Sequence, residues 1–231
     1  ALNTITQGER QQIRTQWVGV TAQEEMPLIV ELTEAEQEWR DAHPILRLGT
    51  DPKWLPIDSV GLDGTYQGIA ADYLRLAAER LGFQVELVAK RSWADSLEKM
   101  KAGKLDILST VAQTPERGTF MNFTQPFVKF PIVIFTRDDA PFVGDVKELG
   151  GKRVAVVEEY RSQVELSKNH PDLELVVFKD TSAGLQAVVS GQAFAFVGNL
   201  ATASYVIQKE VLTNLKVAAP TPYAYNQSIG V

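Results

Sequence analysis

The chain of 231 residues contains no cysteine, and histidine occurs only twice. Without thiols it has no disulfide, no thiol nucleophile and no thiolate metal site. His43 and His170 each precede a proline and lie far apart in the sequence, so they make a poor metal site. No Ser–His–Asp set and no Walker-type glycine loop is visible. We therefore expect no cofactor, no bound metal and no catalytic activity in the chain itself.

Positive charge and long apolar runs are also scarce. The formal net charge is -6 and the isoelectric point is about 5.1, which argues against nucleic-acid binding and against a polybasic membrane contact. No stretch of about 18 apolar residues is present. The lack of cysteine fits a cell-envelope location without establishing it. Since no signal peptide is visible, the chain is either cytoplasmic or excised from a longer protein, and we favour excision.

The first 44 residues differ from the rest. Thr6 and Glu9 have capping-box spacing, which predicts a helix that places Ile13 and Trp17 on one face. The same signature at Thr33–Glu36 predicts a second short helix ending before Pro44. The stretch between them has weak periodicity and is typical of a linker.

Two blocks of strand–helix alternation follow. In each block the order β-α-β-α-β predicts a parallel sheet with helices on its faces. The predicted strands are 45–49, 85–88 and 106–108 in the first block and 153–157, 175–178 and 194–197 in the second. Extended apolar runs at 130–135 and 215–219 predict that the chain crosses to a second lobe and returns.

Several segments in this order resemble the bacterial extracellular solute-binding proteins of the amino-acid-binding type, which have the Venus-flytrap fold. The segments are 46–56, 64–74, 103–108, 114–117, 123–127, 149–157 and 197–200. The resemblance covers residues 45–231 and is closest to the tandem ectodomains of hybrid sensor kinases. It implies an α/β, periplasmic-binding-protein-like type II fold, with two α/β lobes joined by a two-strand hinge.

The resemblance also implies domain boundaries. Lobe 1 comprises residues 45–134 and 222–231, lobe 2 comprises 135–221, and residues 1–44 are a helical segment and linker left from a preceding flytrap domain. Members of the family end with one or more helices after re-entering lobe 1, whereas this sequence stops just after re-entry. We therefore expect the N-terminal helix to cover the lobe 1 surface that such a last helix would cover.

In lobe 1 the resemblance places the contact for a ligand carboxylate at Arg117, with help from Ser109 and Thr110. The local sequence supports this role, because Thr114 and Pro115 provide an N-cap and a first helical residue before Arg117. An arginine in that first turn can bind a carboxylate through two parallel hydrogen bonds. The alternative is a surface arginine paired with Glu116 or with another neighbour.

Two aromatic residues of lobe 1 are candidate ligand contacts. Trp54 follows the first strand, where loops of an open α/β sheet face the ligand, and it predicts a flat apolar wall. The alternative for Trp54 is packing in the lobe 1 core. Tyr66 is a further candidate contact. Trp93 has helical spacing with Leu97 and is predicted to be core.

In lobe 2, Tyr160 and Ser162 begin a helix whose free amides would attract an anionic ligand. Glu159 stands where many family members carry glycine, and its carboxylate either repels an acidic ligand or faces solvent. Amino-acid binders of the family usually have Asp or Glu at the position of Asn199, where it pairs with the ligand ammonium. The neutral Asn199 favours a metabolite that carries a carboxylate or a heteroaromatic ring but no amine. Its alternative role is to cap the following helix.

These observations predict that the chain is the periplasmic sensor domain of a bacterial transmembrane receptor. The full-length receptor is expected to be anchored in the inner membrane and to be a sensor histidine kinase. The expected partners are a small carboxylate-bearing metabolite or amino acid, bound between the lobes, and the neighbouring flytrap and membrane-proximal domains. A homodimer is compatible with this reading, and nucleic acid is not a partner. The alternatives are a binding protein of an ABC transporter, a structural flytrap without ligand, and an enzyme, because some relatives of the fold are dehydratases or are fused to murein-cleaving domains.

Overall fold

The computed structural model describes residues 5–18, 30–89 and 91–231. Most of the predicted linker between Val18 and Leu32, and the side chain of Trp17, lie outside the described residues. The described chain forms two compact units. Unit 1 consists of Ala1–Pro52, Pro56–Phe127 and Gln227–Val231, and unit 2 consists of Lys53–Leu55 and Val128–Asn226.

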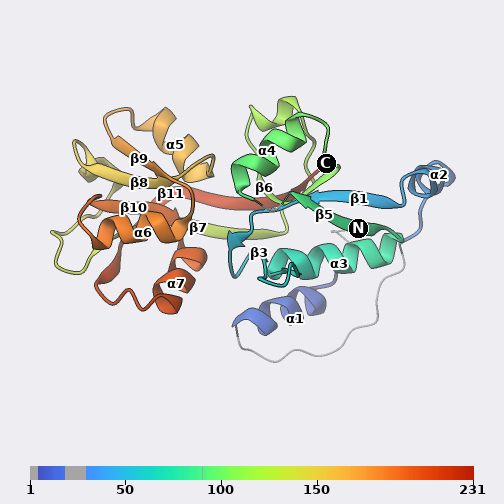
Figure 1. Cartoon of the computed structure of the whole chain (residues 1–231), viewed down its shortest axis with the longest axis horizontal. Helices are drawn as coiled ribbons and strands as arrows, with labels where there is room; N and C mark the ends of the chain where they lie inside the picture. Colours follow the sequence, from blue (N-terminus) through green and yellow to red (C-terminus); the bar gives the residue numbers. More distant parts are fainter. Residues whose placement is uncertain (1–4, 19–29, 90) are drawn as a thin grey trace. The chain divides into compact units, whose positions relative to one another are not determined.

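Unit 1 is built on a parallel sheet with the strand order β5-β1-β6, to which the end of β11 adds an antiparallel strand. The helices α3 and α4 flank this sheet (Figure 1). Leu48 of β1 is fully buried on the side of α3, while Gly49 approaches Ser96 of α4, as the alternation of side chains along a strand requires. The strands are β1 (Ile45–Gly49), β5 (Gln84–Ala89), β6 (Ile107–Ala112) and β11 (Leu215–Gly230), and the helices are α3 (Ile69–Leu81) and α4 (Trp93–Lys101).

A small three-stranded sheet, which the sequence patterns did not predict, follows β1. Its strands are β2 (Lys53–Trp54), β3 (Asp58–Val60) and β4 (Tyr66–Gln67), in the order β2-β3-β4. The sheet leads into α3 through Gly68, whose φ of 123° favours glycine. A Cβ atom at Gly68 would lie 2.6 Å from the carbonyl oxygen of Ile57, so this turn has no room for a side chain.

Unit 2 repeats the β-α-β-α-β order that the sequence predicts. Its parallel strands lie in the order β9-β8-β10, and β7 pairs with β10 in the antiparallel direction. The helix α5 lies on one side of this sheet, and α6 and α7 lie on the other (Figure 1). The strands are β7 (Val128–Arg137), β8 (Arg153–Val157), β9 (Glu174–Phe178) and β10 (Ala195–Asn199), and the helices are α5 (Arg161–Asn169), α6 (Thr181–Val189) and α7 (Leu200–Lys209).

The expected double crossing is present, but its boundaries differ from the predicted ones. The chain passes between the units after Phe127 and after Asn226, rather than after residues 134 and 221. The reason is that β7 pairs with β10 from Ile132 to Thr136, which ties the strand to unit 2. Helix α6 is capped by Asp180, whose carboxylate accepts from the Ala183 amide.

The N-terminal helix α1 (Gln7–Val18) packs against α3 of unit 1. Its predicted capping box is formed, because Glu9 accepts from the backbone and hydroxyl of Thr6 while Thr6 accepts from the Glu9 amide. Ile5 and Ile13 are buried, and the Glu9 carboxylate pairs with the guanidinium of Arg80. This helix therefore covers part of unit 1, as the sequence led us to expect.

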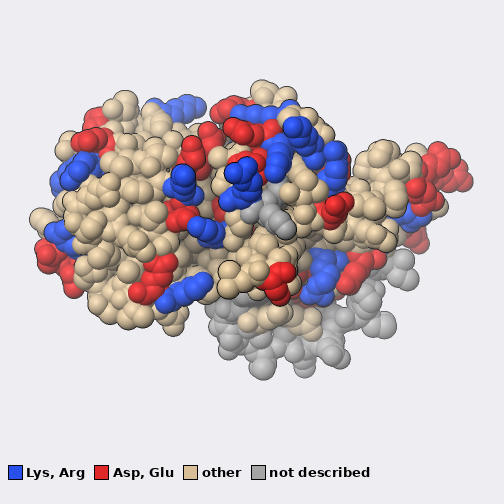
Figure 2. Space-filling model, in the orientation of Figure 1, with Lys and Arg blue, Asp and Glu red and all other residues tan. Residues whose placement is uncertain are grey.

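Helix α2 (Glu34–Ala42) has a complete capping box at Thr33 and no buried residue. Charged side chains of both signs are interspersed over the face shown in Figure 2. Within the described ranges, no helix is both long and apolar enough to cross a membrane.

Candidate functional site

Buried polar side chains meet in unit 1 at the carboxyl ends of two parallel strands. Thr50 follows β1, Ser109 and Thr110 lie in β6, and Asp58 enters from β3. The hydroxyls of Ser109 and Thr110 both donate to Oδ2 of Asp58, the second over 2.9 Å, and Ser109 also contacts the Thr50 hydroxyl at 3.2 Å. All four side chains are at most 2% exposed. Ser109 and Thr110, which were predicted site residues, thus hold a carboxyl group that the prediction did not include.

Burial raises the pKa of Asp58 to about 7, although the hydrogen bonds from the surrounding hydroxyls lower it. The second carboxyl oxygen, Oδ1, is buried and has no hydrogen-bond partner among the described residues. Tyr66 lies beside the same group, and burial together with the negative charge of Asp58 raises the pKa of its phenol. Its hydroxyl lies near Asp58 and Ser109, yet it completes no well-aligned hydrogen bond within the described chain. Two polar groups of this cluster are therefore available to a further partner.

Arg117 is placed differently from the prediction. It begins a 3-10 turn, Arg117–Thr119, rather than an α-helix, and the Thr114 hydroxyl accepts from its backbone amide at 3.2 Å. The side chain is 5% exposed, donates to the carbonyl of Ala112 and lies 5.5 Å over the ring of Trp93. Because Arg117 is buried, it is not the surface arginine of the alternative, and Glu116 contacts Lys101. Trp93 is buried, as predicted.

Asn199 ends β10 in unit 2 and caps α7, which was its alternative role. Its Oδ1 accepts from the amides of Ala201 and Thr202 at 2.8 and 3.2 Å. The same side chain is 3% exposed, and its Nδ2 has no partner in the described parts of the chain. Because the carbonyl is used by the cap, Asn199 offers only a hydrogen-bond donor to other groups.

Tyr160 and Ser162 meet aromatic side chains of unit 2. Tyr160 is the N-cap residue of α5, and the Ser162 hydroxyl lies 3.4 Å from that of Tyr225. The ring centroid of Trp54 lies 6.0 Å from that of Tyr160 and 5.4 Å from that of Tyr225. Trp54 is 5% exposed. Trp54 is thus buried, but among residues of unit 2 rather than in the core of unit 1.

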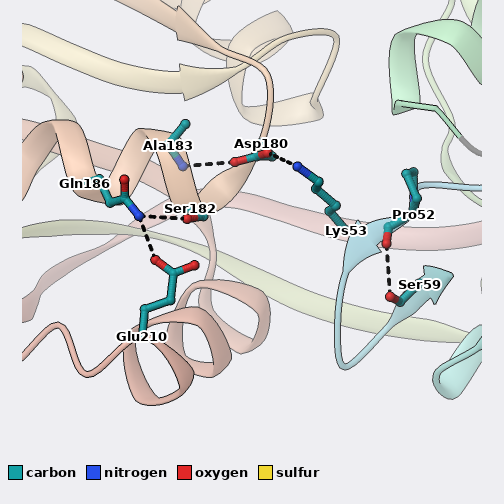
Figure 3. Close-up of polar contacts among 8 residues, drawn as sticks. All are labelled: Pro52, Lys53, Ser59, Asp180, Ser182, Ala183, Gln186 and Glu210. Atoms are coloured by element: carbon teal, nitrogen blue, oxygen red, sulfur yellow. Dashed lines mark hydrogen bonds and ion pairs between the residues drawn. The ribbon is translucent and has the colours of Figure 1, made fainter. Parts of the chain in front are cut away.

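The neighbouring Lys53 also anchors the segment Lys53–Leu55 in unit 2. Its ammonium contacts Oδ2 of Asp180 at 2.8 Å, while Oδ1 of Asp180 accepts from the Ala183 amide (Figure 3). Burial raises the pKa of Asp180, but the hydrogen bonds from Lys53 and Ala183 outweigh it and leave the pKa below its ordinary value. Lys53 and Trp54 therefore attach the segment to unit 2 by one ion pair and two ring contacts.

A model of the bacterial extracellular solute-binding proteins, family 3, matches residues 46–210. The chain belongs to this family. Its fold is the periplasmic-binding-protein-like type, in agreement with the expectation from the sequence.

Among the relatives of this family-3 chain is the virulence sensor protein BvgS of Bordetella pertussis, 27% identical over 184 residues. That match covers 80% of the chain but only 15% of the sensor, so the chain spans a small part of that relative's length. The periplasmic VFT2 domain of B. pertussis BvgS has a similar structure, with a TM-score of 0.75, 25% identity and coverage of 87% and 85% of the two chains. The arginine-bound form of truncated ArgBP from T. maritima has a TM-score of 0.72, 24% identity and coverage of 84% and 91%.

The structure brings six of the nine predicted site residues of the family-3 chain into two groups. Ser109, Thr110 and Tyr66 gather at Asp58 in unit 1, and Trp54, Tyr160 and Ser162 gather at Tyr225 in unit 2. Thr114 and Arg117 form a local turn against Trp93, and Asn199 caps α7.

Sequence patterns missed Thr50, Asp58 and Tyr225. Asp58 is separated from Ser109 and Thr110 by 51 and 52 residues, so only the folded chain brings these groups together. One signal was present, because an acidic residue between Ile57 and Ser59 is unusual in a segment that is otherwise apolar or small. Tyr225 carried no such signal.

Proposed function

We propose that this family-3 chain is the periplasmic ligand-binding part of a bacterial transmembrane signalling receptor, and that it binds a small carboxylate-bearing metabolite or an amino-acid-like solute between its two lobes. The proposal follows the family assignment and the likeness to BvgS, which is named a virulence sensor protein. Histidine-kinase output, an inner-membrane anchor and contacts with neighbouring flytrap and membrane-proximal domains are parts of the same proposal.

The observation that carries the proposal is the position of unsatisfied polar groups. In unit 1, Oδ1 of Asp58 and the hydroxyl of Tyr66 lie beyond the carboxyl ends of β1 and β6. In unit 2, Nδ2 of Asn199 and the hydroxyl of Thr202 lie at the carboxyl end of β10. Open α/β sheets bind ligands at this end of their strands, and a buried polar group without a partner costs about 1–3 kcal/mol. A bound ligand would provide the missing partners.

The chemistry of Asn199 favours a ligand group that accepts hydrogen bonds. Its amide nitrogen presents N–H donors, while the amides of Ala201 and Thr202 are already used by its own Oδ1. The first turn of α5 adds a helix N-terminus beside Ser162 that has no side-chain cap. A carboxylate suits these donors better than an ammonium group. Within unit 1, the buried Asp58 is an acceptor for a hydroxyl or amine group.

The first experiment is a calorimetric and thermal-unfolding titration of the protein with amino acids, organic acids and aromatic metabolites. A ligand at about 100 times its Kd should raise the free energy of unfolding by about 2.7 kcal/mol. The matched variant is Asn199→Asp, because aspartate caps a helix as well as asparagine but replaces the amide donor by a charged acceptor. We expect it to weaken binding of a carboxylate ligand at least tenfold while leaving the ligand-free stability nearly unchanged.

Other results would change the assignment. Stronger binding by the Asn199→Asp variant would identify a ligand whose amine faces this residue. A folded protein that binds no compound of the panel would contradict the sensor proposal and favour a structural flytrap module.

A second candidate is a binding protein that delivers solute to a transporter. It is favoured by the structural likeness to ArgBP, which was solved with arginine bound. An immunoblot of cell fractions distinguishes the two functions. A receptor is retained in the membrane fraction at a mass well above 25.5 kDa, whereas a transport binding protein is released with the periplasmic contents at about that mass.

A further inference from the structure

A basic pocket lies in unit 2 at the amino ends of the parallel strands, the opposite end of the sheet from the groups at Asn199. Its lining comes from the end of β7 at Arg137, the start of β8 at Arg153 and the residues 191–194 that precede β10. The cavity has a volume of about 310 Å³. Since every lining residue belongs to unit 2, the pocket is complete within that unit.

Three cationic side chains line the pocket, and two of them converge on one glycine. Nη2 of Arg153 donates to the carbonyl of Gly191 at 3.3 Å. Nη1 of Arg137 lies 3.3 Å from the position that a Cβ atom of Gly191 would occupy. Gly191 has a φ of 75°, so glycine is favoured at the point where both guanidinium groups approach the backbone.

The third cationic side chain, Lys152, is held by an aromatic ring, and the turn beside the pocket is held by Lys216. Nζ of Lys152 lies 4.1 Å from the ring centroid of Phe194, a favourable cation–π distance. Outside the lining, Lys216 donates to the carbonyls of Asp138 and Ala140 and so fixes the turn that follows β7. The cationic groups are therefore held in place before any ligand binds.

Negative charge in the pocket does not balance these cations. Asp139 is the carboxylate among the lining residues, and it pairs with Arg137 at 3.0 Å. Lys152 and Arg153 form no ion pair with any residue that the structure describes. The pocket thus has an excess of two positive charges on a protein whose formal net charge is -6. Like charges held close together are unfavourable unless an anion lies between them.

We propose that this pocket binds a phosphate monoester. A phosphate dianion matches the two uncompensated charges, and arginine guanidinium groups bind phosphate oxygens through paired hydrogen bonds. The pocket is larger than the phosphate group alone, and Phe194 and Pro141 provide apolar surface for the organic part of the ester. The site is separate from the proposed ligand site at Asn199 and does not depend on it.

The test is calorimetry and amide NMR with phenyl phosphate and with inorganic phosphate, in chloride buffer of constant ionic strength. Saturable binding should shift the amide signals of Gly191 and Phe194, and phenyl phosphate should bind more tightly than inorganic phosphate. The variants Arg153→Gln and Lys152→Met should each weaken binding at least tenfold.

The control is Lys209→Met, since Lys209 also lies over an aromatic ring of unit 2, 5.7 Å from Tyr205, but outside the pocket. It should leave phosphate binding unchanged, as should Asn199→Asp, which alters the other site. Absence of saturable binding, or an equal loss in the Lys209 variant, would overturn the proposal. Loss of metabolite binding in the Asn199 variant with phosphate binding intact would show that the two sites are independent.

The phosphate monoester could be a soluble compound or a lipid headgroup, and sedimentation with phosphatidylcholine vesicles that contain phosphatidic acid separates these sources. Retention on vesicles that phenyl phosphate reverses and Arg153→Gln abolishes identifies the lipid. Binding of phenyl phosphate without retention identifies a soluble ester. Either result supports the pocket, whereas retention that Arg153→Gln does not change contradicts it.

Discussion

At the scale of single residues, Asp58 is the group from which we expect the largest effect on the pH dependence of the free energy of unfolding. Its carboxyl is fully buried beneath two hydroxyl donors, and its pKa of about 7 lies above the ordinary value of 3.8. The folded protein therefore holds this proton more tightly than the unfolded chain does. The resulting stabilisation is complete below the ordinary pKa of the carboxyl and is lost as the pH rises through 7.

The prediction is that the free energy of unfolding falls between pH 5 and pH 8, by up to about 1.4 kcal/mol per pH unit below pH 7. The variant Asp58→Asn should remove most of this slope, because its amide oxygen still accepts from Ser109 and Thr110 but does not ionise. Urea unfolding of both proteins at several pH values measures the difference. Glu98→Gln, which changes an exposed carboxylate of α4, should leave the slope intact; equal slopes in the wild type and Asp58→Asn would contradict the assignment.

The sequence predicted part of this residue-scale picture. The family resemblance named Ser109, Thr110 and Arg117 as ligand contacts, which stays a prediction, and the structure shows that Ser109 and Thr110 contact Asp58. The resemblance did not predict what Arg117 contacts, since the cation–π contact with Trp93 joins residues of different elements. Asp58 and Tyr225 were missed for the same reason. Their partners are distant in the sequence, and no local pattern encodes such contacts.

At the scale of elements, the two capping boxes of the N-terminal region have the same spacing but different surroundings. Glu9 is nearly buried and pairs with Arg80 of α3, whereas Glu36 lies in an exposed helix. Glu9→Gln should lower the free energy of unfolding by about 1–3 kcal/mol, because it leaves the buried Arg80 with a weaker partner. Urea denaturation measures this loss, and Glu36→Gln is the matched control, for which we expect a much smaller shift of the midpoint. Equal effects would mean that α1 adds no more to unit 1 than the exposed helix does.

Gly68 joins the small sheet to α3 and tests another element-scale requirement. Alanine at this position would need a φ of 123°, and its Cβ would lie 2.6 Å from the Ile57 carbonyl oxygen. We expect Gly68→Ala to cost at least about 2 kcal/mol in the free energy of unfolding. Gly118→Ala is a suitable control, since nothing lies within 4 Å of the added methyl group and its φ is ordinary. A small effect at Gly68, measured by thermal unfolding, would show that the turn rearranges.

At the scale of the whole molecule, the alternation of strands and helices was enough to predict the parallel strands β5-β1-β6 of unit 1, the parallel strands β9-β8-β10 of unit 2 and a double crossing of the chain. It did not predict that these strands belong to one eight-stranded sheet that also has antiparallel members. The predicted boundaries were seven residues late at the first crossing and five residues early at the second. An extended apolar run does not indicate which sheet it joins; only the register of β7 against β10 does that. The three short strands after β1 escaped prediction because two-residue strands have no periodicity to detect.

The acidic composition and the buried Asp58 act in opposite directions near pH 5. Approaching the isoelectric point of about 5.1 removes the charge repulsion that keeps molecules apart, while protonated Asp58 makes each folded molecule more stable. We predict that light scattering is greatest near pH 5, and that the scattering material keeps its native near-ultraviolet circular dichroism. Because Asp58 is already protonated in the folded protein at pH 5, Asp58→Asn leaves the native charge there unchanged. Its scattering maximum should therefore occur at the same pH, whereas a shifted maximum, or loss of the native spectrum, would mean that unfolding rather than lost repulsion drives the association.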